Sequence, residues 1–523
     1  MTQEKFFWAD QIADRIIKEK GNKKEYVCAS GITPSGTVHI GNFREVITTE
    51  LVVRALQDKG KKVRFIYSWD DYDRFRKVPV GIDKKYENYI GMPLSKVPSP
   101  FKKSQSYAEH FEKEFETSLV KVGINPEFIR QSEMNKKCKY ASLIKVIIDK
   151  RIEIVKILNK YRKEPLKKDW MPVKVYCEKC GNDFTRIINA EGYFIEYECK
   201  CGFKDKIDYR KKGLVKVPWR IDWPMRWKYE EVDFEPGGAD HSAAGGSFDT
   251  AKGIIKKIFD YEVPLYYVYS WIRIKGGKDF SSSEGNALSL DEVEEVYEPE
   301  VLRYLFVGTR PNKEFQISFD NDIIKIYEDY DVLEKKYYEG QANPQEKRIY
   351  ELSQLKKPVR RSAYTQPSRC RARAQDPKAR NVGAKKKPEK AGFRHLITSV
   401  QLKKEKELNK ESQARAKKVA KWIEKYAGED MKFEVKTEIS AELSEKEKEA
   451  MKELRKSLES RDFNEEKLFD EFYSICEKLE MKNKEFFDAA YRVIIGKNKG
   501  PRLASLILTI GKDKIIKLLE QVK

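Results

Sequence analysis

The N-terminal part of the chain alternates between helical and extended apolar patterns. Residues 5–20 place apolar side chains at helical spacing and predict a helix. The short apolar stretch 25–30 then predicts a strand, 43–60 predicts a helix that ends at Gly60, and 62–69 predicts a second strand. Strand, loop, helix and strand in this order make a βαβ unit, so we expect a parallel sheet with a right-handed crossover.

The rest of the chain changes pattern several times. Amphipathic helices are predicted over 95–160, a strand-like apolar run over 263–274 and helices over 291–339. Residues 359–380 hold six arginines and one lysine with little apolar periodicity, which favours a basic, disordered linker. From 396 to 523 the pattern is helical throughout, which predicts a separate α-helical domain.

Length and charge narrow the class of protein. A chain of 523 residues is too long for one hydrophobic core and indicates roughly three or four domains. The net charge of +21 favours an anionic partner such as nucleic acid, although a general preference for lysine would give the same surplus. The N-terminus does not resemble a signal peptide, and no apolar run approaches the roughly 18 residues that span a bilayer. We therefore expect a soluble, cytoplasmic protein with no membrane partner.

Four of the eight cysteines form two close pairs, and a glycine follows each pair: Cys177 and Cys180 with Gly181, and Cys199 and Cys201 with Gly202. Two such knuckles of thiolates fit a structural zinc ion, Zn²⁺, in tetrahedral coordination, and the glycines suit the tight turns of the knuckles. A redox dithiol is the rival interpretation, and the second pair argues against it.

The loop between the first strand and the first helix of the βαβ unit carries candidate chemistry. A helix N-terminus offers free N–H groups and a partial positive charge, which suit phosphate. His39 and Asn42 can donate hydrogen bonds to phosphate oxygens as charge builds on them, whereas an ordinary glycine-rich turn is the plainer interpretation. Small residues in this loop let a ligand approach the backbone: Gly31, Ser35, Gly36 and Gly41.

Longer strings around these residues resemble the class I aminoacyl-tRNA synthetases. TPSGTVHIGN (33–42) is similar to the "HIGH" motif of that class, and GGKDFSSSEGNALSL (276–290) resembles its "KMSKS" loop. PGGADHSAAGGSFD (236–249) resembles the segment that meets the ribose of ATP, where Asp240 can accept a hydrogen bond from a ribose hydroxyl. The strings YSWDDYDRFRKVP (67–79) and WRIDWPMRW (219–227) are similar to the archaeal-type class I lysine enzymes.

The resemblance implies an α/β fold, in which a Rossmann-like parallel sheet is split by a zinc-containing insertion and followed by an α-helical anticodon-binding domain. The expected segments are a first catalytic half over 1–95, a helical and zinc-ribbon insertion over 96–215, a second catalytic half over 216–290, a helical connector over 291–340, a basic linker over 341–395 and the anticodon-binding domain over 396–523.

The resemblance also implies a reaction and its site. The enzyme would join L-lysine to AMP, using ATP with Mg²⁺, and then pass the lysine to the 3′-terminal adenosine of tRNA(Lys). The residues expected to stabilise the charge in the first step are His39, Asn42, Lys278, Ser281, Ser282 and Ser283. Those expected to contact ATP are Ser35, Gly36, His39, Gly41, Asn42, Asp240 and Lys278. Those expected to contact the amino acid are Gly31, Thr33, Trp223, His241 and Tyr269.

Two points stay open at this stage. The KMSKS-like loop departs from the pattern at Asp279, so either Lys275 or Lys278 is the cation that stabilises the transition state. A buried ammonium of lysine also needs acceptors. Asp70, at the end of the second predicted strand and followed by Asp71 and Asp73, is a candidate, because ligands bind at the carboxyl ends of strands in open sheets.

The alternative for these three carboxylates is that they pair with Arg74 and Arg76. Two alternatives for the whole protein also remain: a class I synthetase for another amino acid, and a tRNA-binding paralogue that has lost catalysis. The proposed activity requires the turn at 31–42 and the loop at 276–286 to close on one triphosphate, so we expect them to lie together.

Overall fold

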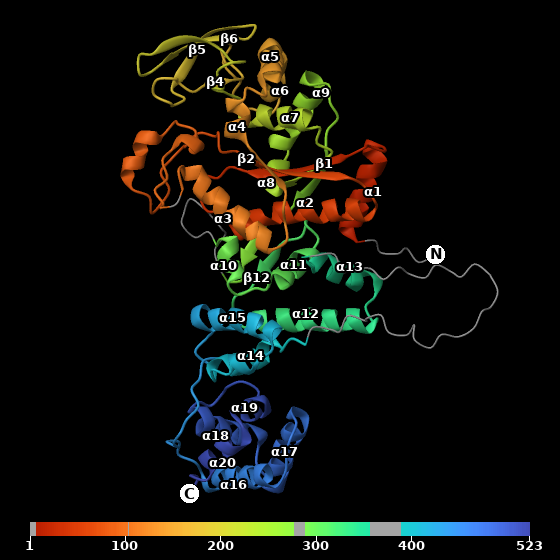
Figure 1. Ribbon diagram of the computed structural model, residues 1–523, viewed down its shortest axis with the longest axis vertical. Coiled ribbons are helices and arrows are strands. Elements are labelled where there is room, and N and C mark those ends of the chain that lie inside the picture. Colours follow the sequence, from red (N-terminus) through yellow and green to blue (C-terminus); the bar gives the residue numbers. More distant parts are fainter. Residues whose placement is uncertain (1–6, 103, 277–287, 356–388) are drawn as a thin grey trace, which may run out of the picture. The chain divides into compact units, whose positions relative to one another are not determined.

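The computed structural model describes residues 7–102, 104–276, 288–355 and 389–523 (Figure 1). The chain divides into two compact units, each with its own core. The first unit consists of residues 1–294, 302–317 and 343–359, and the second consists of residues 295–301, 318–342 and 360–523.

Five parallel strands form the central sheet of the first unit, in the order β10-β9-β1-β2-β3. Their bounds are β1 Tyr26–Ile32, β2 Val63–Trp69, β3 Glu127–Arg130, β9 Phe234–Gly238 and β10 Leu265–Tyr269. Gly31 pairs with Ser68 in the register of β1 and β2, so the carboxyl ends of these two strands lie side by side. The predicted parallel sheet and its first βαβ unit are confirmed.

Helices cover both faces of this sheet (Figure 1). On one face lie α1 (Trp8–Lys20) and α2 (Ile40–Asp58). On the other, apolar side chains of the sheet pack against α6 (Arg151–Asn159), α7 (Trp219–Glu230) and α9 (Ser247–Ile258) in one continuous core. Helix α2 begins three residues earlier than predicted, directly behind His39, because its first turn is closed by hydrogen bonds between His39 and Asn42.

A long insertion separates the two halves of the sheet. Helix α3 (Tyr107–Lys121) leads into β3, after which come α4 (Gln131–Lys136), α5 (Ala141–Asp149) and α6. The insertion then forms a β-rich ribbon in which the cysteines lie. The strands of the ribbon are β4 Lys174–Val175, β5 Thr185–Glu191, β6 Phe194–Cys199, β7 Lys204–Asp208 and β8 Val215–Lys216, all in antiparallel pairs.

The strand-like run over 263–274 is two strands rather than one. After β10, the chain forms β11 (Ile272–Ile274), which pairs with β12 (Phe315–Ile317) in a separate two-stranded sheet. The prediction that 291–339 is helical is wrong at β12, because this short strand depends on a partner more than 40 residues away. The helices of this range are α10 Leu290–Glu294, α11 Pro299–Gly308 and α12 Asp322–Glu339.

The predicted linker over 341–395 is too long. Helix α13 (Pro344–Ser353) lies inside it, with Asn343 capping the helix and Glu346 completing a capping box. Arg348 of this helix forms ion pairs with Asp10 and Asp58 of the first unit. The arginine-rich part of the predicted linker falls on 356–388, outside the described residues.

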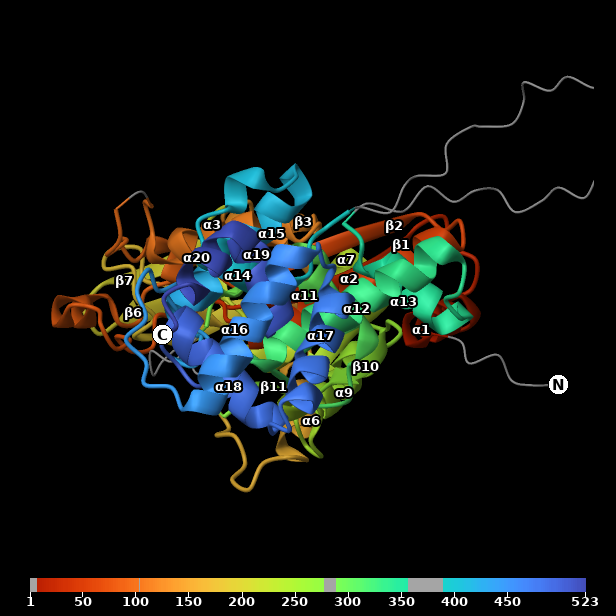
Figure 2. The ribbon, with the colours of Figure 1, turned by 90° about the horizontal axis from the view of Figure 1, so that it is seen from below.

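Residues 396–523, in the second unit, form helices joined by loops with no strand among them, as predicted. The C-terminal helices share one apolar core, and they lie together in both ribbon views (Figures 1 and 2). The helices from 389 onward are α14 Phe393–Gln401, α15 Lys410–Lys425, α16 Glu445–Ser460, α17 Glu465–Lys478, α18 Asn483–Ile495, α19 Leu503–Ile510 and α20 Lys512–Leu519. In the part of the chain that the structure describes, no helix is both long and apolar enough to cross a bilayer.

Candidate active site

The turn between β1 and α2 presents His39 and Asn42 at the start of a 19-residue helix. The backbone N–H of His39 donates to Asn42 Oδ1 over 3.3 Å, and the N–H of Asn42 donates to the His39 carbonyl over 2.9 Å. Burial lowers the pKa of His39 to about 4, so its ring is neutral at pH 7. The turn therefore offers uncharged donors and a positive helix end, which suit a phosphate.

The end of the KMSKS-like string contacts this turn. The N–H of Ile40 donates to the carbonyl of Leu288 over 2.9 Å, and His39 and Ser289 form an antiparallel bridge. Leu288 and Ser289, the described end of that string, therefore lie beside the HIGH-like turn. The loop's own candidates, Lys278, Ser281, Ser282 and Ser283, lie outside the described residues.

The carboxyl end of β9 is shaped by two glycines. A Cβ atom at Gly237 would lie 1.9 Å from the Tyr266 hydroxyl oxygen, and one at Gly238 would lie 2.4 Å from Asp240 Oδ1. No larger residue fits at either position without displacing these side chains. Asp240 follows directly in the short helix α8 (Ala239–Ser242) with its side chain 52% exposed. Its carboxylate is therefore accessible to a ligand at the end of the strand.

Aromatic side chains from α7 form one wall of a pocket at the ends of β1 and β2. Trp219 and Trp223 stack with their ring centroids 5.3 Å apart, and the ring of His241 lies 6.0 Å from that of Trp223. Both tryptophans line the same pocket as Gly31. A Cβ at Gly31 would lie 2.5 Å from the carbonyl oxygen of Ser68, so only glycine fits between the strands there.

Glu45, which the sequence did not single out, contacts two of the expected residues, Gly31 and Tyr269. Its two carboxylate oxygens accept hydrogen bonds from the N–H of Gly31 (2.9 Å) and the hydroxyl of Tyr269 (2.7 Å). Burial, opposed by these two hydrogen bonds, raises the pKa of Glu45 to about 8. One signal in the sequence could have identified Glu45. It lies three residues after Asn42, so the side chains of Asn42 and Glu45 face the same side of the helix.

Glu235 of β9 is a carboxylate that lines the pocket. It accepts a hydrogen bond from the indole N–H of Trp227, and burial raises its pKa to about 7. Glu235 also raises the pKa of Glu45 by charge repulsion, as does Asp240. A cation that enters between these carboxylates relieves that repulsion, so the site is suited to a positively charged ligand.

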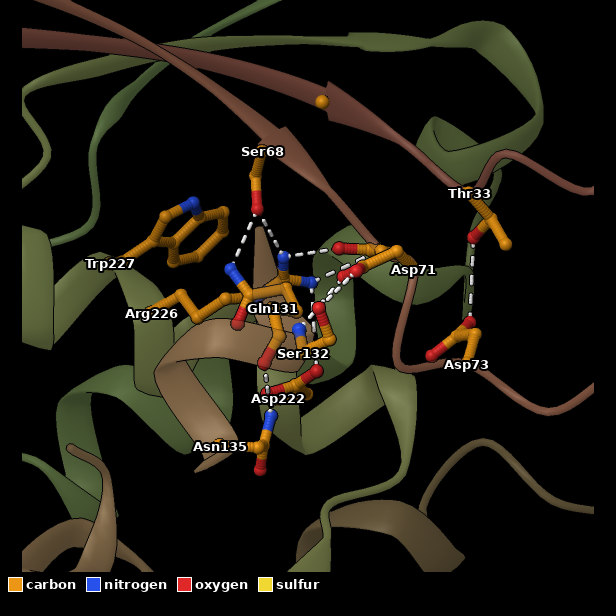
Figure 3. A network of polar contacts seen from close by, with 12 residues as sticks. Thr33, Ser68, Asp71, Asp73, Gln131, Ser132, Asn135, Asp222, Arg226 and Trp227 are labelled. Atoms are coloured by element: carbon orange, nitrogen blue, oxygen red, sulfur yellow. Dashed lines mark hydrogen bonds and ion pairs between the residues drawn. The ribbon is translucent and has the colours of Figure 1, made fainter. Parts of the chain in front are cut away.

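The three aspartates that follow β2 have partners within the protein, but these are not Arg74 and Arg76 (Figure 3). Asp70 forms a forked ion pair with Arg226, whose guanidinium also donates to the Ser68 hydroxyl over 2.9 Å. Asp71 accepts hydrogen bonds from the N–H and hydroxyl of Ser132. Asp73 forms an ion pair with Lys216 (2.9 Å) and accepts a weak hydrogen bond from the Thr33 hydroxyl.

Two conclusions follow for these aspartates. The alternative of pairing with Arg74 and Arg76 is wrong, because Arg226 of α7 and Lys216 at the end of the insertion form the ion pairs with Asp70 and Asp73 instead. Asp70 lines the same pocket as Gly31, but its charge is balanced by Arg226. It is therefore a weaker candidate for an ammonium ligand than Glu45 or Glu235.

The four cysteines of the ribbon converge on one point. The Sγ atoms of Cys177 and Cys201 lie 3.7 Å apart, those of Cys180 and Cys199 lie 3.6 Å apart, and all four lie within 4.8 Å of one another. Tetrahedral zinc with Zn–S bonds of about 2.3 Å needs S–S separations of about 3.8 Å. The thiols therefore fit a zinc ion.

The backbone around the cysteines has the predicted knuckle turns. Gly181 and Gly202 have φ angles of +78° and +85°, a region that glycine adopts without strain. The N–H of Gly181 donates to the carbonyl of Cys177 over 2.8 Å, and that of Gly202 donates to the carbonyl of Cys199 over 2.9 Å. A hydrogen bond from the N–H of Phe203 lowers the pKa of Cys201 to about 7, which favours its thiolate form.

Comparison with known proteins identifies the family of the chain. Residues 6–356 match the family model of the class I (K) tRNA synthetases, and residues 394–523 match the model of an anticodon-binding domain. A lysine–tRNA ligase from Borreliella burgdorferi is 44% identical over 98% of both chains, and one from Treponema pallidum is 42% identical over 98% of both. One from Pyrococcus horikoshii is 40% identical over 98% of this chain and 99% of its own. The chain therefore belongs to the family of class I lysine–tRNA ligases.

Proposed function

We propose that the protein activates L-lysine with ATP and transfers it to tRNA(Lys). In the first step, the carboxylate of lysine attacks the α-phosphorus of ATP, an oxygen–phosphorus bond forms, and pyrophosphate leaves. In the second step, a hydroxyl of the 3′-terminal adenosine attacks the lysyl carbonyl, and AMP leaves. Positioning and electrostatics account for the first step, because no protein nucleophile is needed.

The hydrogen bond between Ile40 and Leu288 carries this proposal. It ties the end of the KMSKS-like loop to the HIGH-like turn, so donors from two distant parts of the sequence can act on the same triphosphate. His39 and Asn42 approach it from the start of α2, together with the small residues Ser35, Gly36 and Gly41. Lys278, Ser281, Ser282 and Ser283 are proposed to hold the leaving pyrophosphate, and Asp240 to accept a hydrogen bond from the ribose.

Lysine recognition is proposed to use the group around Gly31. The substrate carries two ammonium groups. Glu45, which is bonded to Gly31, and Glu235, which lines the pocket, accept hydrogen bonds but form no ion pair with any described residue. Thr33, Trp223, His241 and Tyr269 complete the proposed pocket, and Asp70 supports it through Arg226. An ammonium between these carboxylates exchanges its hydration shell for charge-assisted hydrogen bonds.

The remaining parts of the chain are proposed to serve the same reaction. The helices over 394–523 bind the anticodon region of tRNA(Lys), and the surplus of basic residues favours contact with its phosphates. The four cysteines hold a structural Zn²⁺ that folds the ribbon, and Mg²⁺ neutralises charge on the triphosphate. The protein acts in the cytoplasm, where translation takes place, and no membrane partner is proposed.

The test is ATP–pyrophosphate exchange, measured with each of the twenty amino acids in turn. Exchange that depends on lysine supports the proposal, and exchange that depends on another amino acid would reassign the enzyme within its class. If no amino acid supports exchange while tRNA still binds, the protein is a tRNA-binding relative without catalysis.

A matched pair of variants tests the role of the turn. His39→Ala should lower exchange by about 100-fold or more, as expected when a donor to a developing oxyanion is removed. His395→Ala is the control, because His395 is exposed on α14 in the second unit. Equal exchange in the two variants would remove His39 from the mechanism.

A further inference from the structure

A second polar pocket lies beside the nucleotide-binding turn. It is lined by Thr33, Ser35, Asp73, Arg74, Phe75, Arg76, Lys77, Pro79 and Leu94. Three of these residues are cations and one is a carboxylate. The charge of the carboxylate, Asp73, is balanced by Lys216 at 2.9 Å, so the pocket carries a clear positive excess. The proposed binding of lysine and ATP leaves these three cations unused.

The three cations differ in how they are held. Arg74 is half-buried, lies 3.4 Å from Asp183 and is stacked over the ring of Phe184, both of which belong to the cysteine-bearing ribbon. Arg76 and Lys77 are exposed. No carboxylate among the described residues forms an ion pair with either of them. Arg76 and Lys77 are therefore available to an anionic ligand.

The loop that carries these cations is fixed in place. The N–H of Phe75 donates to the carbonyl of Met92 over 2.7 Å, and the N–H of Leu94 donates to the carbonyl of Asp73 over 2.8 Å. Phe75 and Leu94 are buried in a small apolar core with Tyr107, whose hydroxyl donates to the carbonyl of Ser35 over 3.1 Å. The pocket is thus preorganised, and it is tied directly to the turn that is proposed to hold ATP.

We propose that this pocket binds a backbone phosphate of the 3′ strand of tRNA and positions the terminal adenosine for the transfer step. This inference rests on the proposed function. Arg76 and Lys77, two exposed cations that form no ion pair with a described carboxylate, are suited to a phosphate oxygen. The three phosphates of ATP are already assigned to the turn at His39 and to the loop that follows Gly276.

The position of the pocket favours RNA over free nucleotide. Pro79 lines the pocket and is followed by Val80, which is 74% exposed, so this part of the pocket borders solvent. The inner side of the pocket is Thr33 and Ser35, next to the residues proposed to hold lysine. A strand that crosses this rim brings its terminal hydroxyl toward the lysyl-adenylate. Arg76 and Lys77 are therefore positioning residues for the second step and should have no part in the first.

The two steps can be measured separately, which gives the test. In the double variant Arg76→Gln/Lys77→Gln, kcat/KM for aminoacylation of tRNA should fall by about tenfold or more, as expected when hydrogen bonds to a charged group are removed. Lysine-dependent ATP–pyrophosphate exchange should stay at the wild-type rate. Arg76→Lys should retain most of the aminoacylation. Arg15→Gln on α1, another exposed cation of the first unit, is the control and should change neither rate.

The salt dependence of tRNA binding gives an independent readout. A plot of log affinity against log salt concentration should become shallower in the double variant by about 0.7 for each phosphate that the protein no longer neutralises. An equal fall in exchange and aminoacylation would assign the pocket to ATP and overturn the proposal, as would a double variant with unchanged aminoacylation and an unchanged salt slope. A wild-type protein without lysine-dependent exchange would contradict the proposed function itself, which is a different outcome.

Discussion

Binding of lysine should release protons, and Glu45 should be the main source. Burial raises the pKa of Glu45 to about 8, so close to nine-tenths of the molecules carry it protonated at pH 7. An ammonium of lysine needs the ionised form, because a neutral carboxyl group gives up the charge-assisted hydrogen bond. Binding at pH 7 should therefore displace about 0.9 of a proton from Glu45. Glu235, with a pKa of about 7, should add about 0.5.

The sign of the pH dependence follows from this linkage. Below pH 8, ionising Glu45 costs about 1.4 kcal/mol for each pH unit, so this residue alone should strengthen lysine binding by about tenfold between pH 6 and pH 7. The gain should level off as the pH passes 8. Titration calorimetry at pH 7 in two buffers of different ionisation enthalpy measures the number of protons released.

Single variants separate the two carboxylates. Glu45→Gln should lower the number of protons released by about 0.9, and Glu235→Gln should lower it by about 0.5. Glu45→Gln should also weaken lysine binding by about tenfold or more through the loss of a hydrogen bond to a charged group. If Glu45→Gln released as many protons as the wild-type protein, Glu45 would not be a ligand of lysine.

Three further outcomes follow from the structure. Gly31→Ala places a Cβ 2.5 Å from the Ser68 carbonyl oxygen, so it should destabilise the protein by about 1–3 kcal/mol in urea unfolding; unchanged stability would show that β1 and β2 can separate there. Cys180→Ser should reduce bound zinc, measured by atomic emission, from one ion per chain to well below one, whereas Cys138→Ser, outside the cluster, should keep it; zinc retained in both would contradict the four-thiolate site. Arg303→Met removes a fully buried guanidinium that lies 2.8 Å from Glu50, so the urea midpoint should fall by the equivalent of about 3 kcal/mol; a midpoint within error of wild type would mean that Arg54 alone balances Glu50.

Much of the fold could be predicted because its signals are local. The apolar periods around β1, α2 and β2 define the βαβ unit, and the helical pattern from 396 onward persists in the structure. The pairing of β11 with β12 could not be predicted, since each strand is three residues long and its partner is distant. Helix α13 was not predicted because most of its residues are polar or charged. Its apolar face is short and is buried at Tyr350 and Leu352.

The candidate site likewise contains residues with a local sequence signal and residues whose role depends on distant partners. His39, Asn42 and the four cysteines belong to compact strings whose spacing already indicates phosphate or metal chemistry. Glu45 belongs to no such string, and its role depends on the approach of Tyr269, which is 224 residues away in the sequence. The partner of Asp70 is Arg226, 156 residues away, whereas the sequence offered the nearby Arg74 and Arg76. Charges close in sequence were a poor guide to charges close in space.

A crystal structure with a non-hydrolysable analogue of lysyl-adenylate tests the central claim most directly. The phosphate of the analogue should lie within hydrogen-bond distance of the turn at His39 and Asn42, with residues 276–288 closed over it and a lysyl ammonium between Glu45 and Glu235. An analogue bound elsewhere, or bound at the turn with its ammonium groups away from both carboxylates, would contradict the mechanism proposed for lysine activation.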